Sequence, residues 1–364
     1  MIVKGKHYRT IWLSKDGWSV NIINQVALPH KFIIEKLKTL KDAAEAISQM
    51  KVRGAPLIGV TAAYGICLAL RKETSDTSIS SAAEVLLRTR PTAVNLQWAV
   101  AKMLAFIKKI PESNHEERIR VAYSSASKIC EKDVIACRKI GKYGLKLIRS
   151  IYRTNNKDTI NILTHCNAGW LAAVDYGTAL APIYAAHEDG LPVHVWVDET
   201  RPRNQGASLT AWELGQQGIP HTVIVDNAGG HLMQKGEVDL CITGTDRTTS
   251  NGDVCNKIGT YLKALAAKDT NTPFYVALPG STIDWSMRNG IKQVPIEERN
   301  SEEVTHIEGY TKDGSFSKVR LTPKKSFAAN PAFDITPAKL VTALITDRGV
   351  CEAKRSSLRS LYKR

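Results

Sequence analysis

The sequence lacks several features that mark specialised classes of protein. None of its seven cysteines forms a C-x-x-C pair, so the usual zinc-binding and thiol-exchange motifs are missing. No apolar run approaches the roughly 20 residues of a membrane-spanning helix. No G-x-G-x-x-G follows the first buried strand that we predict, at residues 159–164. These absences argue against a membrane protein, a disulfide-stabilised secreted protein and a dehydrogenase.

The composition is that of a soluble globular protein. The chain has 364 residues, 43% hydrophobic and 23% charged, and this length favours two domains. Its N-terminus is basic but has no uninterrupted apolar segment of the secretory kind. We therefore predict a cytoplasmic protein whose cysteines are free thiols.

Positive charge is in excess, with a formal net charge of +15. Such an excess suits an anionic partner, either a nucleic acid or a phosphorylated metabolite. The densest basic stretches are residues 318–325 and 353–364, and neither carries an aromatic pattern of the RNA-binding type. We interpret both as solvated faces, so the sequence favours a small anionic ligand over a nucleic acid.

The two halves of the chain have different periodicities. In the first half, residues 8–28 predict a β-hairpin turning at Asp16-Gly17, and helical periodicity follows at 41–50, 54–71, 93–109 and 115–152. In the second half, short apolar runs alternate with helix-like segments at 170–187, 207–217 and 255–267. The apolar runs are residues 159–164, 192–198, 221–226, 238–243 and 273–278.

This alternation predicts an α/β fold with a parallel, Rossmann-like sheet covered on both faces. We predict a smaller, mostly helical N-terminal domain with a β-hairpin at residues 1–145. A Rossmann-like catalytic domain follows at residues 146–364, with the boundary near Gly141 and Gly144.

Ligands of an open parallel sheet bind outside the carboxyl ends of the strands. That rule selects the loops at 164–169, 199–206, 227–230 and 244–256. Cys166, in the first loop, would begin a helix whose dipole lowers the thiol pKa; the alternative is an inert turn residue. We expect neighbouring His165 to be structural.

Charged residues in the other loops extend this candidate site. Asp246 follows the fourth strand, although an Asx-turn or a salt bridge with Arg247 would also explain it. We predict that Asn256 and Lys257 open a helix and grip a phosphate. Arg53 and Arg90 each precede a proline and a predicted helix, a pattern typical of anion sites.

Together these motifs resemble the methylthioribose-1-phosphate isomerase branch of a larger superfamily. That superfamily also holds ribose-1,5-bisphosphate isomerases and the regulatory subunits of a translation-initiation exchange factor. The resemblance covers nearly the whole chain. It rests on RGAPLIG (53–59), RPTAVNLQWA (90–99), THCNAG (164–169), ETRPRNQGASLTAWEL (199–214), GTDRTTSNGDVCNKIGTY (244–261) and VALPGSTID (276–284).

The resemblance implies an aldose-ketose isomerase of methionine salvage, usually a homodimer, that uses no metal or redox cofactor. Cys166 and Asp246 are the implied catalytic pair. The implied sugar-phosphate ligands are Arg53, Gly54, Ala55, Arg90, Gln205, Asn256 and Lys257.

The chemistry of an aldose 1-phosphate fits this pair. Its esterified anomeric oxygen prevents simple ring opening, so the ring oxygen needs a proton donor, for which Asp246 is suited if burial raises its pKa. Cys166 would either move a proton from carbon 2 to carbon 1 or stabilise a hydride shift between them.

Some positions differ from the family pattern, and these keep two alternatives open. Ser208, Gln97 and the threonines at 245, 248 and 249 stand where other residue types are common. They leave open another 5-modified substrate, such as 5-deoxyribose 1-phosphate or ribose 1,5-bisphosphate. The second alternative is a non-catalytic exchange-factor subunit, which the presence of both Cys166 and Asp246 disfavours.

Overall fold

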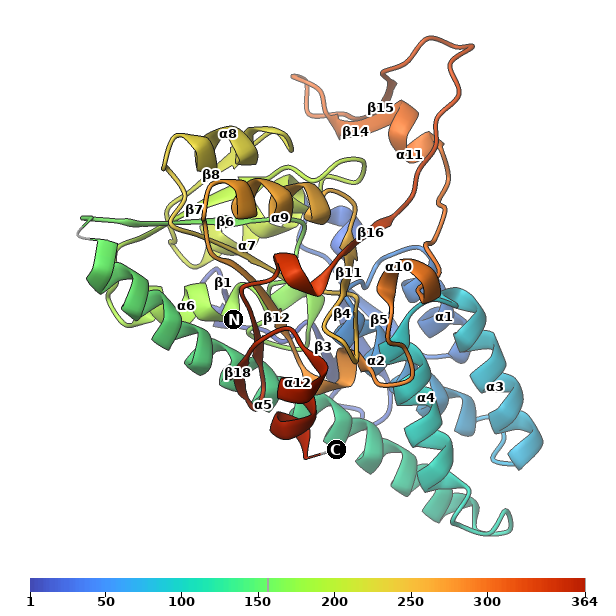
Figure 1. The fold of residues 1–364 in the computed structure, drawn as a ribbon. Coiled ribbons are helices and arrows are strands. Elements are labelled where there is room, and N and C mark those ends of the chain that lie inside the picture. Colours follow the sequence, from blue (N-terminus) through green and yellow to red (C-terminus); the bar gives the residue numbers. More distant parts are fainter. Residues whose placement is uncertain (156, 364) are drawn as a thin grey trace.

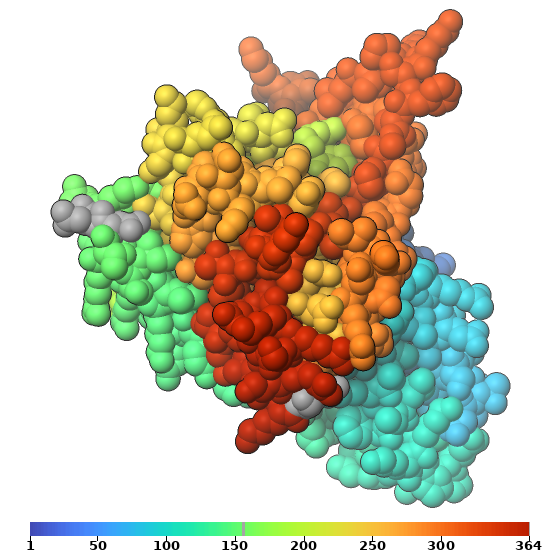
Figure 2. All heavy atoms as spheres, in the orientation of Figure 1, coloured from blue at the N-terminus to red at the C-terminus, as the bar shows by residue number. Residues whose placement is uncertain are grey.

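A computed structural model describes residues 1–155 and 157–363. It has a helical N-terminal part and an α/β C-terminal part (Figure 1). The strands β14 (His306–Tyr310) and β15 (Phe316–Arg320) form a hairpin that projects from the rest of the surface (Figure 2). In the described part of the chain, no helix is both long and apolar enough to cross a membrane.

The predicted hairpin is confirmed, and a third strand joins it. Strands β3 (Ile11–Leu13) and β4 (Val20–Ile23) pair antiparallel, and β5 (Ile34–Leu37) pairs with β4. The carboxylate of Asp16 accepts the backbone N–H groups of Trp18 and Ser19, which stabilises the turn.

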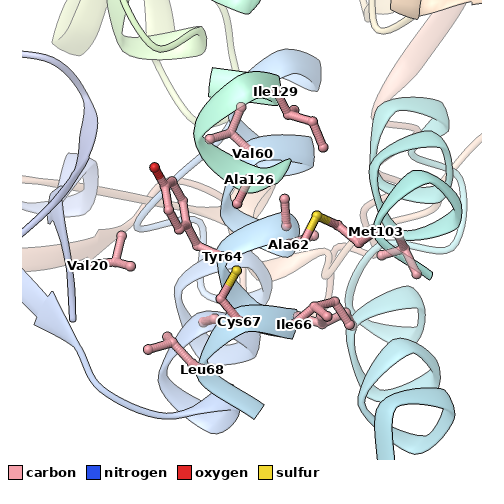
Figure 3. Close-up of a cluster of buried hydrophobic side chains, with 14 of the residues drawn as sticks. Val20, Val60, Ala62, Tyr64, Ile66, Cys67, Leu68, Met103, Ala126 and Ile129 are labelled. Atoms are coloured by element: carbon pink, nitrogen blue, oxygen red, sulfur yellow. The ribbon is translucent and has the colours of Figure 1, made fainter. Parts of the chain in front are cut away.

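The helical part packs around one central helix. α2 (Ala55–Leu70) is buried on almost every side, and its apolar residues meet Met103 of α4, Ala126 of α5 and Val20 of β4 (Figure 3). The sequence analysis predicted four of the five helices and missed α3. The helices around α2 are α1 (Leu40–Ser48), α3 (Asp76–Thr89), α4 (Val94–Ile107) and α5 (His115–Asn155).

All five predicted buried strands belong to one seven-stranded sheet. The order of its strands is β18-β17-β12-β9-β6-β7-β8. Its strands are parallel except for the edge pair β17–β18, which confirms the predicted α/β class. Their bounds are β6 (Ile160–Thr164), β7 (Val193–Asp198), β8 (His221–Ile224), β9 (Leu240–Thr243), β12 (Phe274–Leu278), β17 (Ala343–Thr346) and β18 (Gly349–Cys351).

Helices cover both faces of this sheet (Figure 1). One core layer joins Ile162 to Ile183 of α6 (Ala181–Glu188) and Leu214 of α7 (Ala211–Gln216). The other joins Leu163 to Met233 of α8 (Ala228–Gln234) and to the alanines of α9 (Thr260–Asp269). Successive side chains of β6 therefore point into opposite core layers, as the alternation of a strand requires.

Two of the predicted helices, at 255–267 and 170–187, begin later in the chain than expected. Residues 255–257 belong to strand β11 (Val254–Lys257), which pairs with β10 (Arg247–Thr249) and β16 (Phe333–Thr336), and α9 begins only at Thr260. Strand β13 (Ile283–Asp284) completes this second, four-stranded sheet. In the stretch 170–187, Trp170–Ala172 is a 3-10 turn and α6 begins at Ala181.

The predicted domain boundary lies inside α5, and the division at residue 145 stays a prediction. Gly141 and Gly144 do not interrupt this helix, contrary to the interpretation of the sequence. They let α6 approach: a Cβ on Gly144 would lie 2.3 Å from Pro182 Cγ, and one on Gly141 would lie 3.1 Å from the Ala181 carbonyl oxygen. The two glycines therefore allow α5 to pack closely against α6.

Candidate active site

Cys166 lies in a turn at the carboxyl end of β6 and is buried. Its φ of 63° falls in the left-handed region, which is uncommon for residues other than glycine. Two threonines hold this turn: the Cys166 N–H donates to Thr200 Oγ1 (2.8 Å), and its carbonyl accepts from Thr210 Oγ1 (2.7 Å). Surrounding hydrogen bonds thus over-determine the strained backbone that presents the sulfur.

The expected helix N-terminus at Cys166 is absent, so the argument from a helix dipole was wrong. The next regular element is the short 3-10 turn at Trp170. Positive side chains take the place of the dipole. Arg53 Nη2 lies 3.9 Å from Cys166 Sγ, and Cys166 also interacts electrostatically with Lys257. The sulfur therefore lies among cations rather than at a helix terminus.

Arg53 is held by the loop that contains Cys166. Its guanidinium donates to Asn167 Oδ1 (2.6 Å) and to the Asn167 carbonyl oxygen (2.7 Å). Gly54, with a φ of 89°, makes this approach possible, because a Cβ there would lie 2.4 Å from the Ala172 carbonyl oxygen. Ala55 then begins α2 and is buried.

Glu213, on α7, holds the loop that follows β6. Its buried carboxylate accepts the Asn167 side-chain amide (2.9 Å), the Tyr184 hydroxyl (2.6 Å) and the backbone N–H groups of Trp170 and Leu171. Burial raises the pKa of Glu213, and these hydrogen bonds lower it. The sequence analysis missed both Asn167 and Glu213. A glutamate within the apolar stretch SLTAWEL was the available signal.

Asp246 is half-buried among positive side chains. Burial raises its carboxyl pKa above the ordinary value, while Lys257, Arg90 and Arg53 act in the opposite direction. The rival explanation, a salt bridge with Arg247, is wrong. Arg247 pairs with Asp284 at 3.3 Å instead.

Lys257 is buried on β11, beside the ring of Phe333. Burial lowers its pKa, while Cys166 and Asp246 raise it. Asn256 is also buried and donates to Thr260 Oγ1 at 3.0 Å. The prediction that these two residues open a helix was wrong, because β11 places them on a strand.

Arg90 and Gln205 each lie near other members of this charged group. Arg90 is buried and pairs with Glu297 at 3.0 Å. Gln205 and Arg53 line a cavity of about 530 Å³ that reaches His306 and Phe316 of the projecting hairpin. Among the residues that the structure describes, buried Gln205 Oε1 has no hydrogen-bond partner.

The electrostatic interactions therefore bring five predicted residues together: Arg53, Arg90, Cys166, Asp246 and Lys257. Gln205 reaches the same site through the cavity that it shares with Arg53. A group of three cations, one carboxyl and one thiol is suited to binding an anion and moving a proton.

His165 faces away from this group, as the sequence analysis expected. Its two ring nitrogens contact Asp198 Oδ2 (3.0 Å) and the Ile258 carbonyl oxygen (2.8 Å). His165 therefore makes no dyad with Cys166.

Comparison with known proteins gives a consistent family assignment. A model described as the initiation factor 2 subunit family matches residues 51–353. A methylthioribose-1-phosphate isomerase from Sinorhizobium medicae is 60% identical over 363 residues, covering 100% of this chain and 99% of that protein. One from Rhodospirillum centenum is 58% identical over 362 residues, covering 100% and 96%.

Solved structures agree with the sequence relatives. The crystal structure of 5-methylthioribose 1-phosphate isomerase from Pyrococcus horikoshii has a TM-score of 0.83 and 40% identity, covering 98% of this chain and 96% of that one. The delta subunit of translation initiation factor eIF-2B from A. fulgidus has a TM-score of 0.80 and 38% identity, covering 98% and 100%.

Glu213→Ala should lower the free energy of unfolding by roughly 3 kcal/mol, because it leaves several buried donors without an acceptor. Urea denaturation measures the change. Glu188→Ala, at an exposed position of α6, is the control and should change stability by less than about 0.5 kcal/mol. A loss below about 1 kcal/mol for Glu213→Ala would contradict the organising role of this carboxylate.

Proposed function

The chain belongs to the methylthioribose-1-phosphate isomerases of the initiation factor 2 subunit family, and we propose that Asp246 and Cys166 carry its reaction. The substrate is 5-methylthioribose 1-phosphate, the product is 5-methylthioribulose 1-phosphate, and the pathway is methionine salvage. The observation that carries the proposal is the grouping of a carboxyl of raised pKa with a thiol and three cations.

The cations bind the phosphate. Arg53, Arg90 and Lys257 supply positive charge from three separate elements, and burial strengthens their attraction for a dianion. Gly54 and Ala55 add backbone N–H groups at the start of α2, where the helix dipole favours negative charge. The side-chain amides of Gln205 and Asn256 complete the set of polar contacts that we assign to the sugar phosphate.

Asp246 protonates the ring oxygen. Burial keeps part of its carboxyl population protonated at higher pH than an exposed aspartate would be, as a general acid requires. As the bond from carbon 1 to the ring oxygen breaks, the proton leaves carbon 2 and its bonding electrons form a double bond between carbons 1 and 2. The resulting enol becomes a ketone when carbon 1 gains a proton and the hydroxyl at carbon 2 loses one.

Cys166 transfers the proton between the two carbons. Arg53 and Lys257 beside its sulfur stabilise the negative charge of an enolate-like intermediate. A hydride shift builds less negative charge on the substrate and gains less from these cations. The charged surroundings therefore favour proton transfer over the hydride shift.

The active form that we propose is a homodimer in the cytoplasm. Val223 on edge strand β8 and Val225 just beyond it are exposed, as is Leu262 on α9. An unpaired edge strand with apolar side chains is suited to isologous pairing with a second copy. Analytical ultracentrifugation should give twice the chain mass, and a monomer at micromolar concentration would contradict this arrangement.

Purified protein should convert 5-methylthioribose 1-phosphate, with higher kcat/KM than for 5-deoxyribose 1-phosphate or ribose 1,5-bisphosphate. Asp246→Asn should lower kcat by at least about 100-fold, because the amide cannot donate the required proton. Asp189→Asn, at an exposed ion pair with Arg149, is the matched control and should leave kcat unchanged.

Two outcomes would redirect the assignment. Full activity of Asp246→Asn would remove this residue from the acid role. No turnover of any sugar phosphate, together with stable binding to exchange-factor subunits, would favour a regulatory protein.

Turnover in D₂O should place deuterium on carbon 1 of the product, because a proton held on Cys166 can exchange with solvent. Mass spectrometry and NMR of the product measure the label. Product without deuterium at carbon 1 would instead support a hydride shift, with Cys166 acting only to stabilise it.

A further inference from the structure

His165 connects the loop of Cys166 to the strand that carries Lys257. It directly precedes Cys166 at the end of β6, and its Nε2 lies 2.8 Å from the carbonyl oxygen of Ile258, which directly follows Lys257 on β11. One buried side chain thus connects the backbone of the thiol loop to the backbone of the phosphate-binding lysine, 91 positions away along the chain. A shift of this ring would move both groups.

The hydrogen-bond partners of the ring determine its proton count. The Ile258 carbonyl oxygen can only accept, so Nε2 must carry a proton. Nδ1 faces Asp198 Oδ2, which also contacts the Lys263 ammonium at 2.9 Å. A carboxyl group next to an ammonium ion favours the ionised form, which can only accept. With Asp198 Oδ2 accepting from the Lys263 ammonium and the Ile258 carbonyl accepting at Nε2, both ring nitrogens are placed to donate.

Charged side chains surround the ring. Asp198 and Lys263 are buried beside it, and Asp226 and Asp334 are half-buried nearby. Asp334, on β16, accepts the N–H groups of Gly259 and Tyr261; burial raises its pKa, and these hydrogen bonds lower it. With three carboxyl groups and the Lys263 ammonium around it, a positively charged ring offsets negative charge that is costly away from water.

The oxygen atoms of Asp198 and Asp226 and a His165 nitrogen lie within 4.8 Å of one another, a spacing that could hold a metal ion. The Lys263 ammonium already approaches both residues, at Asp198 Oδ2 and at the Asp226 carbonyl oxygen. Lysine thus supplies the positive charge at this cluster.

We propose that His165 is a positioning residue held as an imidazolium by Asp198. Its Nε2–H fixes Lys257 through Ile258, and its contact with Asp198 holds the start of the Cys166 loop. The proposal rests on the proposed function for its catalytic consequences, but the state of the ring is independent of them.

The first test is ¹⁵N NMR of histidine-labelled wild-type protein at pH 7, with His165→Gln used to assign the signal. The expected result is a ring with both nitrogens protonated. A neutral tautomer, with one unprotonated nitrogen, would overturn the proposal. This measurement needs no substrate, so it stands even if the enzyme acts on a different sugar phosphate.

The second test separates the two contacts with a pair of amide variants. The amide nitrogen of His165→Gln can replace Nε2 and retain Ile258, whereas that of His165→Asn can replace only Nδ1 and retain Asp198. We expect His165→Gln to lower kcat about 10-fold with KM unchanged, because the contact with Asp198 beside the Cys166 loop is lost while Ile258 and Lys257 stay in place. His165→Asn should also raise KM about 10-fold, since Lys257 is displaced.

His194→Gln, on the same strand as Asp198, is the control and should match wild type, because the His194 ring contacts Thr222 and Trp196, neither of which belongs to the candidate site. Equal kcat and KM for both His165 variants and wild type would overturn the proposal. If wild type turns over no sugar phosphate, the proposed function fails, and the NMR result alone decides the state of His165.

Discussion

Burial of unlike charges at one end of the sheet is the constraint on which the rest of this site depends. Burial shifts the pKa values of Asp246 and Lys257 toward their neutral forms. Lys257, Arg90 and Arg53 oppose this shift for Asp246, whereas Cys166 and Asp246 oppose it for Lys257. No member of such a group is stable alone, because an unpaired buried charge costs several kcal/mol. The fold must therefore hold α2, β11 and the loop after β6 together, and under the proposed function the phosphate of the substrate would add negative charge to this group.

Two buried hydrogen-bond networks provide that rigidity. Glu213 gathers Asn167 and the backbone of the 170–171 turn, and Asn167 in turn holds Arg53. On the other side, Asp198 holds His165, which reaches the end of β11. Each network links a residue of a helix or strand to a loop. These hydrogen bonds fix the loops at the carboxyl ends of the strands relative to the sheet. Preorganised donors and charges of this kind reduce the reorganisation needed during reaction.

Much of this architecture was predictable because it depends on local pattern. Continuous apolar runs identified five of the seven strands of the main sheet, and the rule for ligand sites in parallel sheets selected the loops of Cys166 and Asp246. The errors arose where distant partners override local pattern. Residues 255–257 were predicted as the start of a helix, but they pair with β16, which lies about 80 positions further along the chain. The segment after Cys166 read as a helix because it is apolar, yet Glu213 and Arg53 hold it in turns.

By itself, the sequence determined the α/β class, the family resemblance and the identity of the chemical groups, because these follow from residue type and short-range spacing. Only the tertiary structure decided which groups meet and in what state. It replaced the expected helix dipole at Cys166 with the guanidinium of Arg53, paired Arg247 with Asp284 rather than Asp246, and placed His165 beneath both sides of the site. Burial and charge proximity are properties of three-dimensional packing, and no local pattern of residues specifies them.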